Sequence, residues 1–287
     1  MVKSLPLVSI IITSYNKEKF IIESISSALN QSYQNIEIII VDDASNDCSL
    51  KTILEFIKNE SNCSLICNST NQGVVFSRNI GISNSKGKYI LPLDGDDIIA
   101  NNYIKIAVDY MESHESCGIC YCEAVKFESS SSYEKWNLPE CCLETMFLRN
   151  CIFCTALFRR SDYNRIGGYD SDFYFGFEDW NFWLKILELN RSTYKIPQIL
   201  FYYRKGTNER SNIANKNLKK AMQLIYQKNQ WLLQRPEVLQ KIATYVVNYE
   251  SQEKKHLKII NKQRKFLIIT YIILFILLAA LIYINYL

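Results

Sequence analysis

The densest group of acidic side chains in the sequence is Asp94-Gly95-Asp96-Asp97, which directly follows the apolar run Tyr89 to Leu93. Three carboxylates within four residues repel one another unless a cation or several hydrogen-bond donors compensate their charge. Mg²⁺ and Mn²⁺ prefer oxygen ligands and are usually held by one or two carboxylates together with substrate phosphates. The segment is therefore a candidate metal site, and an Asp-Gly turn with surplus surface acids is the structural alternative.

Polar residues also follow two earlier apolar runs. Asp42-Asp43 comes after Ile36 to Val41, and Thr13-Ser14-Tyr15-Asn16 comes after Val8 to Ile12. Acids at a strand end suit a phosphate or magnesium pocket, and they equally suit the cap of the next helix. An aromatic ring with a polar tip beside two hydroxyl groups suits a nucleotide, and an ordinary turn fits the same residues.

A third acidic pair, Glu178-Asp179, directly precedes Trp180-Asn181-Phe182-Trp183. A carboxylate in a partly desolvated, aromatic surrounding has its pKa raised toward a value useful for deprotonating a hydroxyl group. Asp179 is therefore the candidate general base, with Glu178 as its neighbour. The structural alternative is an acidic helix N-terminus, which the helix dipole favours.

These candidate residues need a scaffold, and the first hundred residues alternate buried strands with amphipathic helices. The predicted strands are 8–12, 36–41, 65–67 and 89–93, and the predicted helices are 17–31, 50–58 and 74–83. This alternation predicts a parallel sheet flanked by helices, whose ligands bind beyond the carboxyl ends of the strands. Farther along, 118–127 and 151–158 resemble strands and 180–189 a helix.

Composition narrows the class of protein. The chain has 287 residues, of which 48% are hydrophobic, enough for a large core. Its ten cysteines occur without a secretory signal, which favours reduced thiols. The pairs Cys117/Cys120 and Cys151/Cys154 suggest zinc, but about thirty residues separate them, longer than the usual spacing. Cys120 and Cys122 are better interpreted as small buried hydrophobes.

The end of the chain predicts a membrane anchor. Residues 266–287 carry no charge and would span about 33 Å as a helix. Six lysine and arginine residues lie between 254 and 265. The whole chain has a net charge of +4, so the remaining residues have a net charge of about −2 (4 − 6). The positive-inside rule then predicts a single-pass protein with a cytoplasmic catalytic domain, and the local basicity argues against nucleic acid. A buried helix of a soluble oligomer is the alternative for the span.

Five short motifs occur in the order and spacing of one known family. They are Val8 to Asn16, Ile39 to Asp47, Gly73 with Arg78-Asn79, Leu93 to Asp97, and Phe177-Glu178-Asp179. Over residues 5–210 the set resembles the family 2 glycosyltransferases of GT-A fold. The expected architecture is α/β: a Rossmann-like nucleotide-binding sheet with flanking helices over 1–214 (a nucleotide-sugar half, 1–100, and an acceptor half, 101–214). This domain would be followed by a helical basic linker over 215–265, in which Pro236 starts a helix. A transmembrane helix over 266–287 would end the chain's predicted elements.

The resemblance implies transfer of a hexosyl or N-acetylhexosaminyl group, with inversion, from a nucleoside-diphosphate sugar, often a UDP-sugar. The acceptor would be a saccharide or a lipid-linked saccharide in surface polysaccharide synthesis, and Mn²⁺ or Mg²⁺ would bridge the diphosphate. By the resemblance, Asp96 binds the metal with Asp94 beside it, and Asp179 is the base. The nucleotide-sugar contacts carried over are Thr13, Ser14, Tyr15, Asn16, Asp42, Asp43, Arg78, Asp94, on the ribose side, and Asp97.

The chain departs from the family's pattern at three places. Thr13 stands where proline is common, Gly95 stands where alanine is usual, and no histidine follows Tyr203-Arg204. Lys205 or Arg210 could supply the missing positive charge. No Gln-x-x-Arg-Trp motif is present, which argues against a processive polysaccharide synthase.

Three other classes of protein remain as alternatives. A membrane-tethered module could bind a nucleotide-sugar without turnover, but the intact Asp96 and Asp179 argue against it. A receiver-like signalling domain explains only Asp42-Asp43. A Ser-His-Asp hydrolase has little support, because neither of the two histidines lies near a nucleophile motif.

Overall fold

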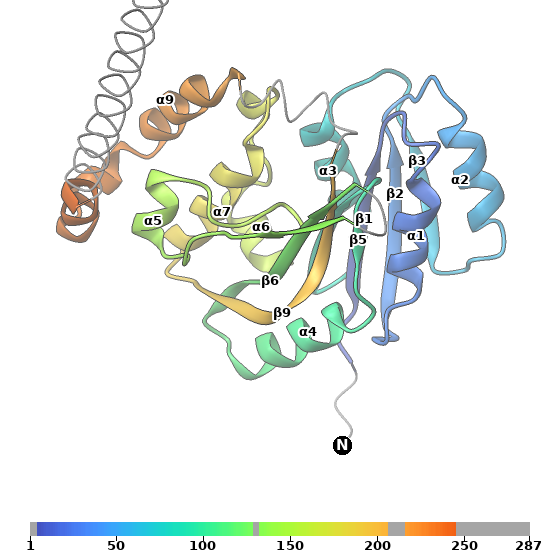
Figure 1. The fold of residues 1–287 in the computed structure, drawn as a ribbon, viewed down its shortest axis with the longest axis horizontal. Helices are drawn as coiled ribbons and strands as arrows, with labels where there is room; N and C mark the ends of the chain where they lie inside the picture. Colours follow the sequence, from blue (N-terminus) through green and yellow to red (C-terminus); the bar gives the residue numbers. More distant parts are fainter. Residues whose placement is uncertain (1–4, 129–131, 206–215, 245–287) are drawn as a thin grey trace, which may run out of the picture. The chain divides into compact units, whose positions relative to one another are not determined.

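The computed structural model describes residues 5–128, 132–205 and 216–244 (Figure 1). Within those ranges one mixed sheet holds nine strands in the order β3-β2-β1-β4-β8-β6-β9-β5, with β7 paired to β6. The strands are β1 Val8–Ser14, β2 Ile36–Asp42, β3 Cys63–Cys67, β4 Tyr89–Asp94, β5 Ile98–Ile99, β6 Cys117–Phe127, β7 Tyr133–Trp136, β8 Leu157–Arg159 and β9 Ser192–Arg204.

The helices alternate with these strands in the first half of the chain and cluster in the second half (Figure 1). They are α1 Ile21–Leu29, α2 Ser49–Ile57, α3 Val74–Ser83, α4 Tyr103–Ser113, α5 Leu143–Leu148, α6 Arg160–Ile166, α7 Glu178–Glu188 and α9 Leu218–Lys228. Short 3₁₀ turns cover Ser171–Phe173 and Gln230–Gln234.

The first half is the predicted parallel sheet. Strands β3, β2, β1 and β4 run parallel, and α1, α2 and α3 connect them. Strands β1, β2 and β4 form because their apolar side chains are buried on both faces, as the full burial of Ile10, Ile11 and Ile12 illustrates, whereas the edge strand β3 has no buried residue. Helix α3 packs on β1 and β2 through Gly81, where a Cβ atom would stand 2.6 Å from Cγ2 of Ile11. The predicted order of strands and helices is confirmed.

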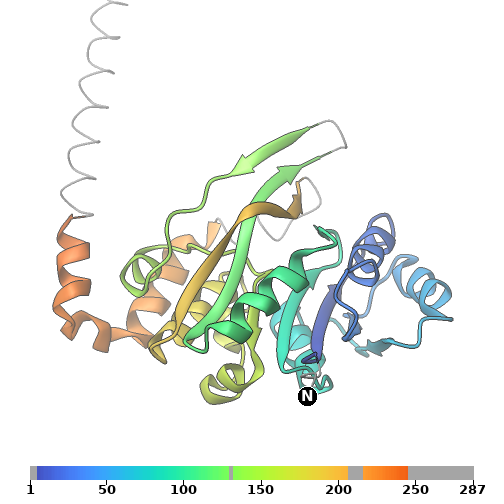
Figure 2. The same cartoon turned by 90° about the horizontal axis from the view of Figure 1, so that it is seen from below.

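Strands β8, β6, β9 and β5 extend the sheet beyond β4. Strand β6 pairs parallel with β9, with register shifts at Cys117/Ile119 and around Glu123. Helix α4 packs on one side of these two strands and α7 packs on the other (Figures 1 and 2). The predicted strand over 118–127 and helix over 180–189 correspond to β6 and α7.

The predicted strand over 151–158 is wrong for most of its length, because only Leu157–Arg159 pairs in the sheet. Cys151 and Ile152 are buried without being part of a strand. Side-chain and turn hydrogen bonds hold this segment instead: the backbone N–H of Ile152 donates to Oδ1 of Asn150, and that of Ala156 donates to the carbonyl of Cys154. An apolar run indicates burial, and here a loop is buried.

The described residues divide into two units between Gln230 and Trp231. Helix α9 belongs to the first unit. The domain boundary expected at 214/215 adjoins residues outside the described ranges and stays a prediction. In the second unit, residues 236–244 are helical and begin at Pro236, as predicted. The Arg235 guanidinium lies 4.8 Å from the ring centre of Trp231 in the same unit.

The predicted membrane localisation requires a correction. In the part of the chain described, no helix has the length and apolar character needed to cross a membrane. The predicted anchor, residues 266–287, lies outside the described residues. The described residues therefore do not support the predicted single-pass anchor with a cytoplasmic catalytic domain.

The cysteines are free thiols in this structure. Cys120 and Cys122 lie in β6 with at most 1% of their surface exposed, which confirms their interpretation as small buried hydrophobes. Burial raises the pKa of the Cys117 thiol to about 11 and that of the Cys122 thiol to about 12, so both are protonated at neutral pH.

Candidate active site

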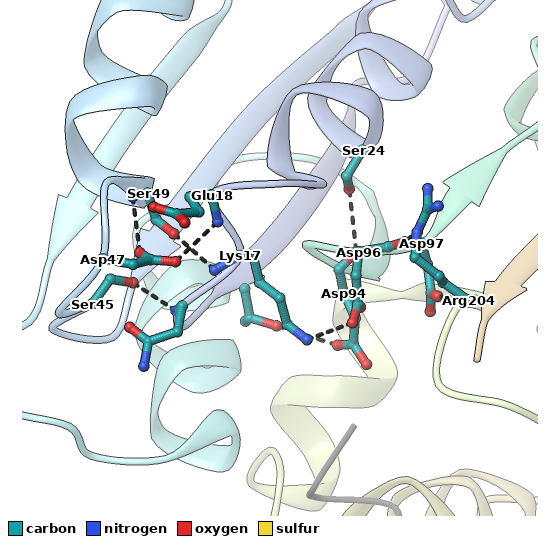
Figure 3. Close-up of polar contacts among 12 residues, drawn as sticks. Lys17, Glu18, Ser24, Ser45, Asp47, Ser49, Asp94, Asp96, Asp97 and Arg204 are labelled. Carbon is teal, nitrogen blue, oxygen red and sulfur yellow. Dashed lines mark hydrogen bonds and ion pairs between the residues drawn. The ribbon is translucent and has the colours of Figure 1, made fainter. Parts of the chain in front are cut away.

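The polar residues predicted to follow β1, β2 and β4 lie at the carboxyl ends of these three neighbouring strands. Figure 3 shows Asp94, Asp96 and Asp97 among them. In the sheet register Thr13 is the partner of Val41 on one side and of Asp94 on the other. The Thr13 hydroxyl donates to Asp94 Oδ1 at 3.3 Å. The Thr13 carbonyl accepts the Gly95 N–H at 2.9 Å. A Cβ atom at position 95 would stand 2.9 Å from that carbonyl oxygen, so the strand ends approach as closely as glycine allows.

Asp42 and Asp43 hold the loops around this edge. Asp42 accepts hydrogen bonds from the backbone N–H and the hydroxyl of Ser45, which closes the turn after β2. Asp43 accepts from the side chain of Asn68 and from the backbone N–H groups of Gln72 and Gly73, the residues just before α3. Both carboxylates are buried, and both thereby shape the walls of the site.

The residues after β1 differ in exposure. The Tyr15 side chain is 41% exposed, so its ring is available to a ligand, whereas Ser14 is buried. Within the described residues the Ser14 hydroxyl has no hydrogen-bond partner. Asn16 has a φ of 53°, a left-handed conformation that asparagine tolerates, and its side chain accepts the Asn46 N–H at 2.8 Å.

A buried guanidinium joins this edge to α7. Arg78, on α3, donates through Nη2 to Asp94 Oδ1 at 2.7 Å and through Nη1 to Glu178 Oε1 at 2.6 Å. Only 1% of the Arg78 side chain is exposed. Burial acts to lower the Arg78 pKa, but the negative charges of Asp94 and Glu178 outweigh it and hold that pKa well above its usual range. Arg78 therefore remains charged and compensates two acids at once.

Asp96 faces an ammonium group. Lys17, in the loop between β1 and α1, places its Nζ 2.5 Å from Asp96 Oδ2 (Figure 3). The Asp96 side chain is 2% exposed and that of Lys17 is 15% exposed. A buried carboxylate needs a compensating charge, and the Lys17 ammonium supplies it to Asp96.

Asp97 is buried beside Asp96, with 1% of its surface exposed. Its Oδ1 accepts the backbone N–H of Arg204 at 2.9 Å, and its buried Oδ2 has no hydrogen-bond partner within the described residues. Burial, followed by the negative charges of Asp96 and Asp94, raises the pKa of Asp97 well above its usual range.

Arg204, at the end of β9, holds the turn that carries these acids. Its Nε donates to the Asp96 carbonyl at 2.9 Å, and its Nη2 donates to Glu23 Oε2 at 2.8 Å. The guanidinium is stacked between two aromatic rings, 4.6 Å from the centre of Phe20 and 4.4 Å from that of Phe127. The planar group thus links α1, β6 and β9 to the Asp96 turn.

The predicted base lies at the first turn of α7. Asp179 accepts hydrogen bonds from the Asn150 side chain at 3.1 Å and from the Trp180 backbone N–H at 2.8 Å. Both donors are neutral, whereas Glu178 is paired with the Arg78 guanidinium. Burial, and then the negative charge of Glu178, raises the pKa of Asp179 to about 6. At neutral pH Asp179 is therefore an ionised carboxylate that accepts protons more readily than usual.

The structure adds four residues that sequence reasoning did not assign to the site. Lys17 contacts Asp96, and Asn150 contacts Asp179. The Sγ atom of Cys154 lies 3.7 Å from Asp94 Oδ2. Arg204 holds the turn that carries Asp96. Of the two basic residues considered as substitutes for histidine, Lys205 pairs with Glu134 on β7, and Arg210 lies outside the described residues. No sequence motif indicates Lys17, Asn150 or Cys154. Arg204 directly precedes the position at which the family frequently has a histidine.

The chain was compared with known proteins. The sequence pattern described as Glycosyl transferase family 2 matches residues 9–167. An uncharacterized glycosyltransferase of Haemophilus influenzae is 30% identical over 241 residues, covering 78% of this chain and 73% of that protein. The UDP-Glc:alpha-D-GlcNAc-diphosphoundecaprenol beta-1,3-glucosyltransferase WfgD of Escherichia coli is 32% identical over 225 residues, covering 76% of this chain and 85% of that protein.

Two solved structures share the fold. The S. aureus TarS 1–349 complex with UDP-GlcNAc has a TM-score of 0.58 at 24% identity, covering 71% of this chain and 60% of that one. The mannosyltransferase PcManGT of Pyrobaculum calidifontis, in complex with GDP-Man and Mn²⁺, has a TM-score of 0.58 at 17% identity, covering 72% of this chain and 59% of that one. At these identities the likeness establishes a GT-A-like α/β fold.

Proposed function

The chain belongs to glycosyl transferase family 2 and is a glycosyltransferase, and on this premise we propose that it transfers a hexosyl or N-acetylhexosaminyl group from a UDP-sugar. The acceptor is a hydroxyl group of a lipid-linked saccharide in surface polysaccharide synthesis, and the transfer inverts the anomeric centre. The name of WfgD, which describes a UDP-Glc donor and a diphosphoundecaprenol-linked acceptor, supports this choice of substrates. UDP-GlcNAc on TarS supports a uridine nucleotide.

One contact carries the proposal: Arg78 binds both Asp94, at the end of β4, and Glu178, the neighbour of Asp179. A donor bound at the strand ends and a base at the start of α7 must face each other for transfer to occur. The Arg78 bridge joins these two regions. The residues proposed to contact the nucleotide are Thr13, Tyr15, Asp43 and Arg78. Asp94 is proposed to lie toward the ribose.

A divalent cation fits the acids of this edge. Asp96 carries a carboxylate neutralised by an ammonium group, and the buried Asp97 Oδ2 has no hydrogen-bond partner within the described residues. Those residues contain no cluster of three or more His, Cys, Asp or Glu side chains that could hold a metal alone. Asp96, with Asp94 beside it, would hold Mn²⁺ or Mg²⁺ together with donor phosphates. When bound, the cation supplies positive charge for the departing diphosphate.

Asp179 is the proposed general base. Its ionised carboxylate accepts the proton of the acceptor hydroxyl as that oxygen attacks the anomeric carbon from the face opposite the diphosphate. The neutral donors on Asp179 orient the carboxylate without neutralising it. Glu178 keeps its charge paired with Arg78 and so positions the base rather than replacing it.

The test is nucleotide release from UDP-, GDP- and dTDP-sugars with a membrane lipid extract as acceptor, with and without Mn²⁺. We expect turnover of one UDP-sugar that depends on Mn²⁺ and falls by at least about 100-fold in Asp96→Ala and in Asp179→Asn. Asp109→Asn, an exposed acid paired with Lys105 on α4, is the matched control and should retain activity. Donor binding without turnover on any acceptor would instead support a non-catalytic binding module.

A further inference from the structure

Lys17 reaches across the site to the acid proposed to bind the cation. Its Nζ contacts Asp96 Oδ2 at 2.5 Å, between residues 79 positions apart in the sequence (Figure 3). Asp96 is buried and Lys17 is mostly covered, so this is an ion pair inside the site. An ammonium group and a divalent cation on the same carboxylate repel each other, so each weakens the binding of the other.

The backbone of Lys17 is held in place by neighbouring loops. Its N–H donates to the Ser49 hydroxyl at 2.7 Å, and its carbonyl accepts the Ile21 N–H at the start of α1. The adjacent Glu18 bonds to the loop after β2 through Asp47 Oδ2 and the Cys48 N–H. Because these bonds fix the main chain, the flexible side chain alone can leave Asp96 (Figure 3).

On the basis of the function proposed above, we propose that Lys17 couples cation binding to donor binding. Before either ligand arrives, the ammonium group compensates Asp96. A cation arriving alone must break the buried ion pair between Lys17 and Asp96, and this cost weakens metal binding. A diphosphate offers Lys17 a new anionic partner and supplies further oxygen ligands to the cation, so the two ligands bind more tightly together than separately.

The coupling has a measurable form. By linkage, the factor by which UDP tightens Mn²⁺ binding equals the factor by which Mn²⁺ tightens UDP binding, and such factors are typically about 5–150. Removing the Lys17 charge removes the competitor for Asp96 and also the partner for the diphosphate. Lys17→Gln should therefore bind Mn²⁺ about tenfold more tightly in the absence of UDP, and the coupling factor should fall about tenfold.

The experiment measures Mn²⁺ binding to the full chain by electron paramagnetic resonance, with and without UDP, and needs no acceptor. Lys17→Gln is compared with Lys17→Arg, which retains the charge, and with Lys19→Gln, which removes an exposed lysine two residues away. Circular dichroism establishes that each variant is folded. We expect tighter Mn²⁺ binding without UDP and a smaller coupling factor in Lys17→Gln. Lys17→Arg and Lys19→Gln should both keep a coupling factor near that of the wild type.

Two results would overturn the inference. The first is unchanged or weaker Mn²⁺ binding by Lys17→Gln alone, with the coupling factor retained. The second is the absence of Mn²⁺ binding by wild type and Lys17→Gln alike, with UDP present. The proposed function is judged separately by the nucleotide-release assay, because sugar transfer without a need for Mn²⁺ would retain the transferase and exclude the coupling.

Discussion

Arg78 Nη1 lies 2.6 Å from Glu178 Oε1, so two residues 100 positions apart in sequence form an ion pair inside the protein. The same guanidinium binds Asp94, and its Nε is buried with no hydrogen-bond partner within the described residues. One positive charge therefore compensates an acid on β4 and an acid on α7. Because both acids depend on Arg78 for their counter-charge, replacing Arg78 should disturb both Asp94 and Glu178.

The first prediction concerns stability. Arg78→Met keeps the apolar length of the side chain but leaves Asp94 and Glu178 without their buried counter-charge. We expect the free energy of unfolding to fall by about 3–5 kcal/mol, measured by urea denaturation at pH 7. Lys51→Met is the control, because its pair with Glu55 on α2 is exposed and should change stability by less than about 1 kcal/mol. Equal effects of the two substitutions would contradict a special role for Arg78.

The second prediction concerns the base. Because Asp179 must be ionised to accept a proton and its pKa is raised to about 6, kcat/KM should fall as the pH drops below about 6 and level off above it. Asp179→Asn should lower kcat by about 10²–10⁴-fold while donor affinity changes little. The measurement is a pH profile of nucleotide release together with donor binding by calorimetry. A variant that keeps the wild-type profile would rule out Asp179 as the base.

The third prediction concerns Asn150. Its Oδ1 accepts the Ile152 N–H, which directs its NH₂ group toward Asp179. This hydrogen bond favours the ionised carboxylate, so Asn150→Ala should raise the Asp179 pKa. We expect the acid limb of the pH profile to move upward by about one pH unit. A lower rate with an unmoved acid limb would mean that Asn150 only supports the loop.

The fourth prediction concerns the support of the Asp96 turn. Arg204→Lys keeps the charge but loses the planar group stacked between Phe20 and Phe127 and its bond to the Asp96 carbonyl. Groups that orient metal ligands typically alter metal affinity or activity by about 10–100-fold when replaced. We expect half-maximal rate to require about tenfold more Mn²⁺. Arg160→Lys, an arginine that bonds the Gly87 and Ile82 carbonyls away from this turn, should leave that requirement unchanged.

The first half of the fold was predictable because each of its signals is local. Buried branched runs predict β1, β2 and β4, and helical stripes predict the connections between them. Parallel strands end at one edge, so Thr13, Asp42 and Asp94 were expected to meet, and the sheet register brings them together. The family motifs lie on these same strand ends, which is why fold and family were recognisable together.

The second half was less predictable because its elements depend on distant partners. The strand β9 alternates poorly and owes its extent to parallel pairing with β6, about 75 residues earlier in the chain. Residues 151–156 are apolar because a loop is buried there. The contacts of Lys17 with Asp96 and of Arg78 with Glu178 likewise arise only after folding, and no spacing in the sequence indicates them.

Two of the chain's departures from the family's pattern touch each other. Thr13 replaces a common proline and Gly95 a usual alanine, and the carbonyl of the first accepts the N–H of the second. A methyl group at position 95 would also come within 3.0 Å of Ile21 Cδ1, on α1. The backbone bond between residues 13 and 95 does not depend on the side chain at position 13, whereas the Ile21 side chain limits what position 95 can hold. Over evolution, a larger residue at position 95 should therefore be accompanied by a smaller one at position 21.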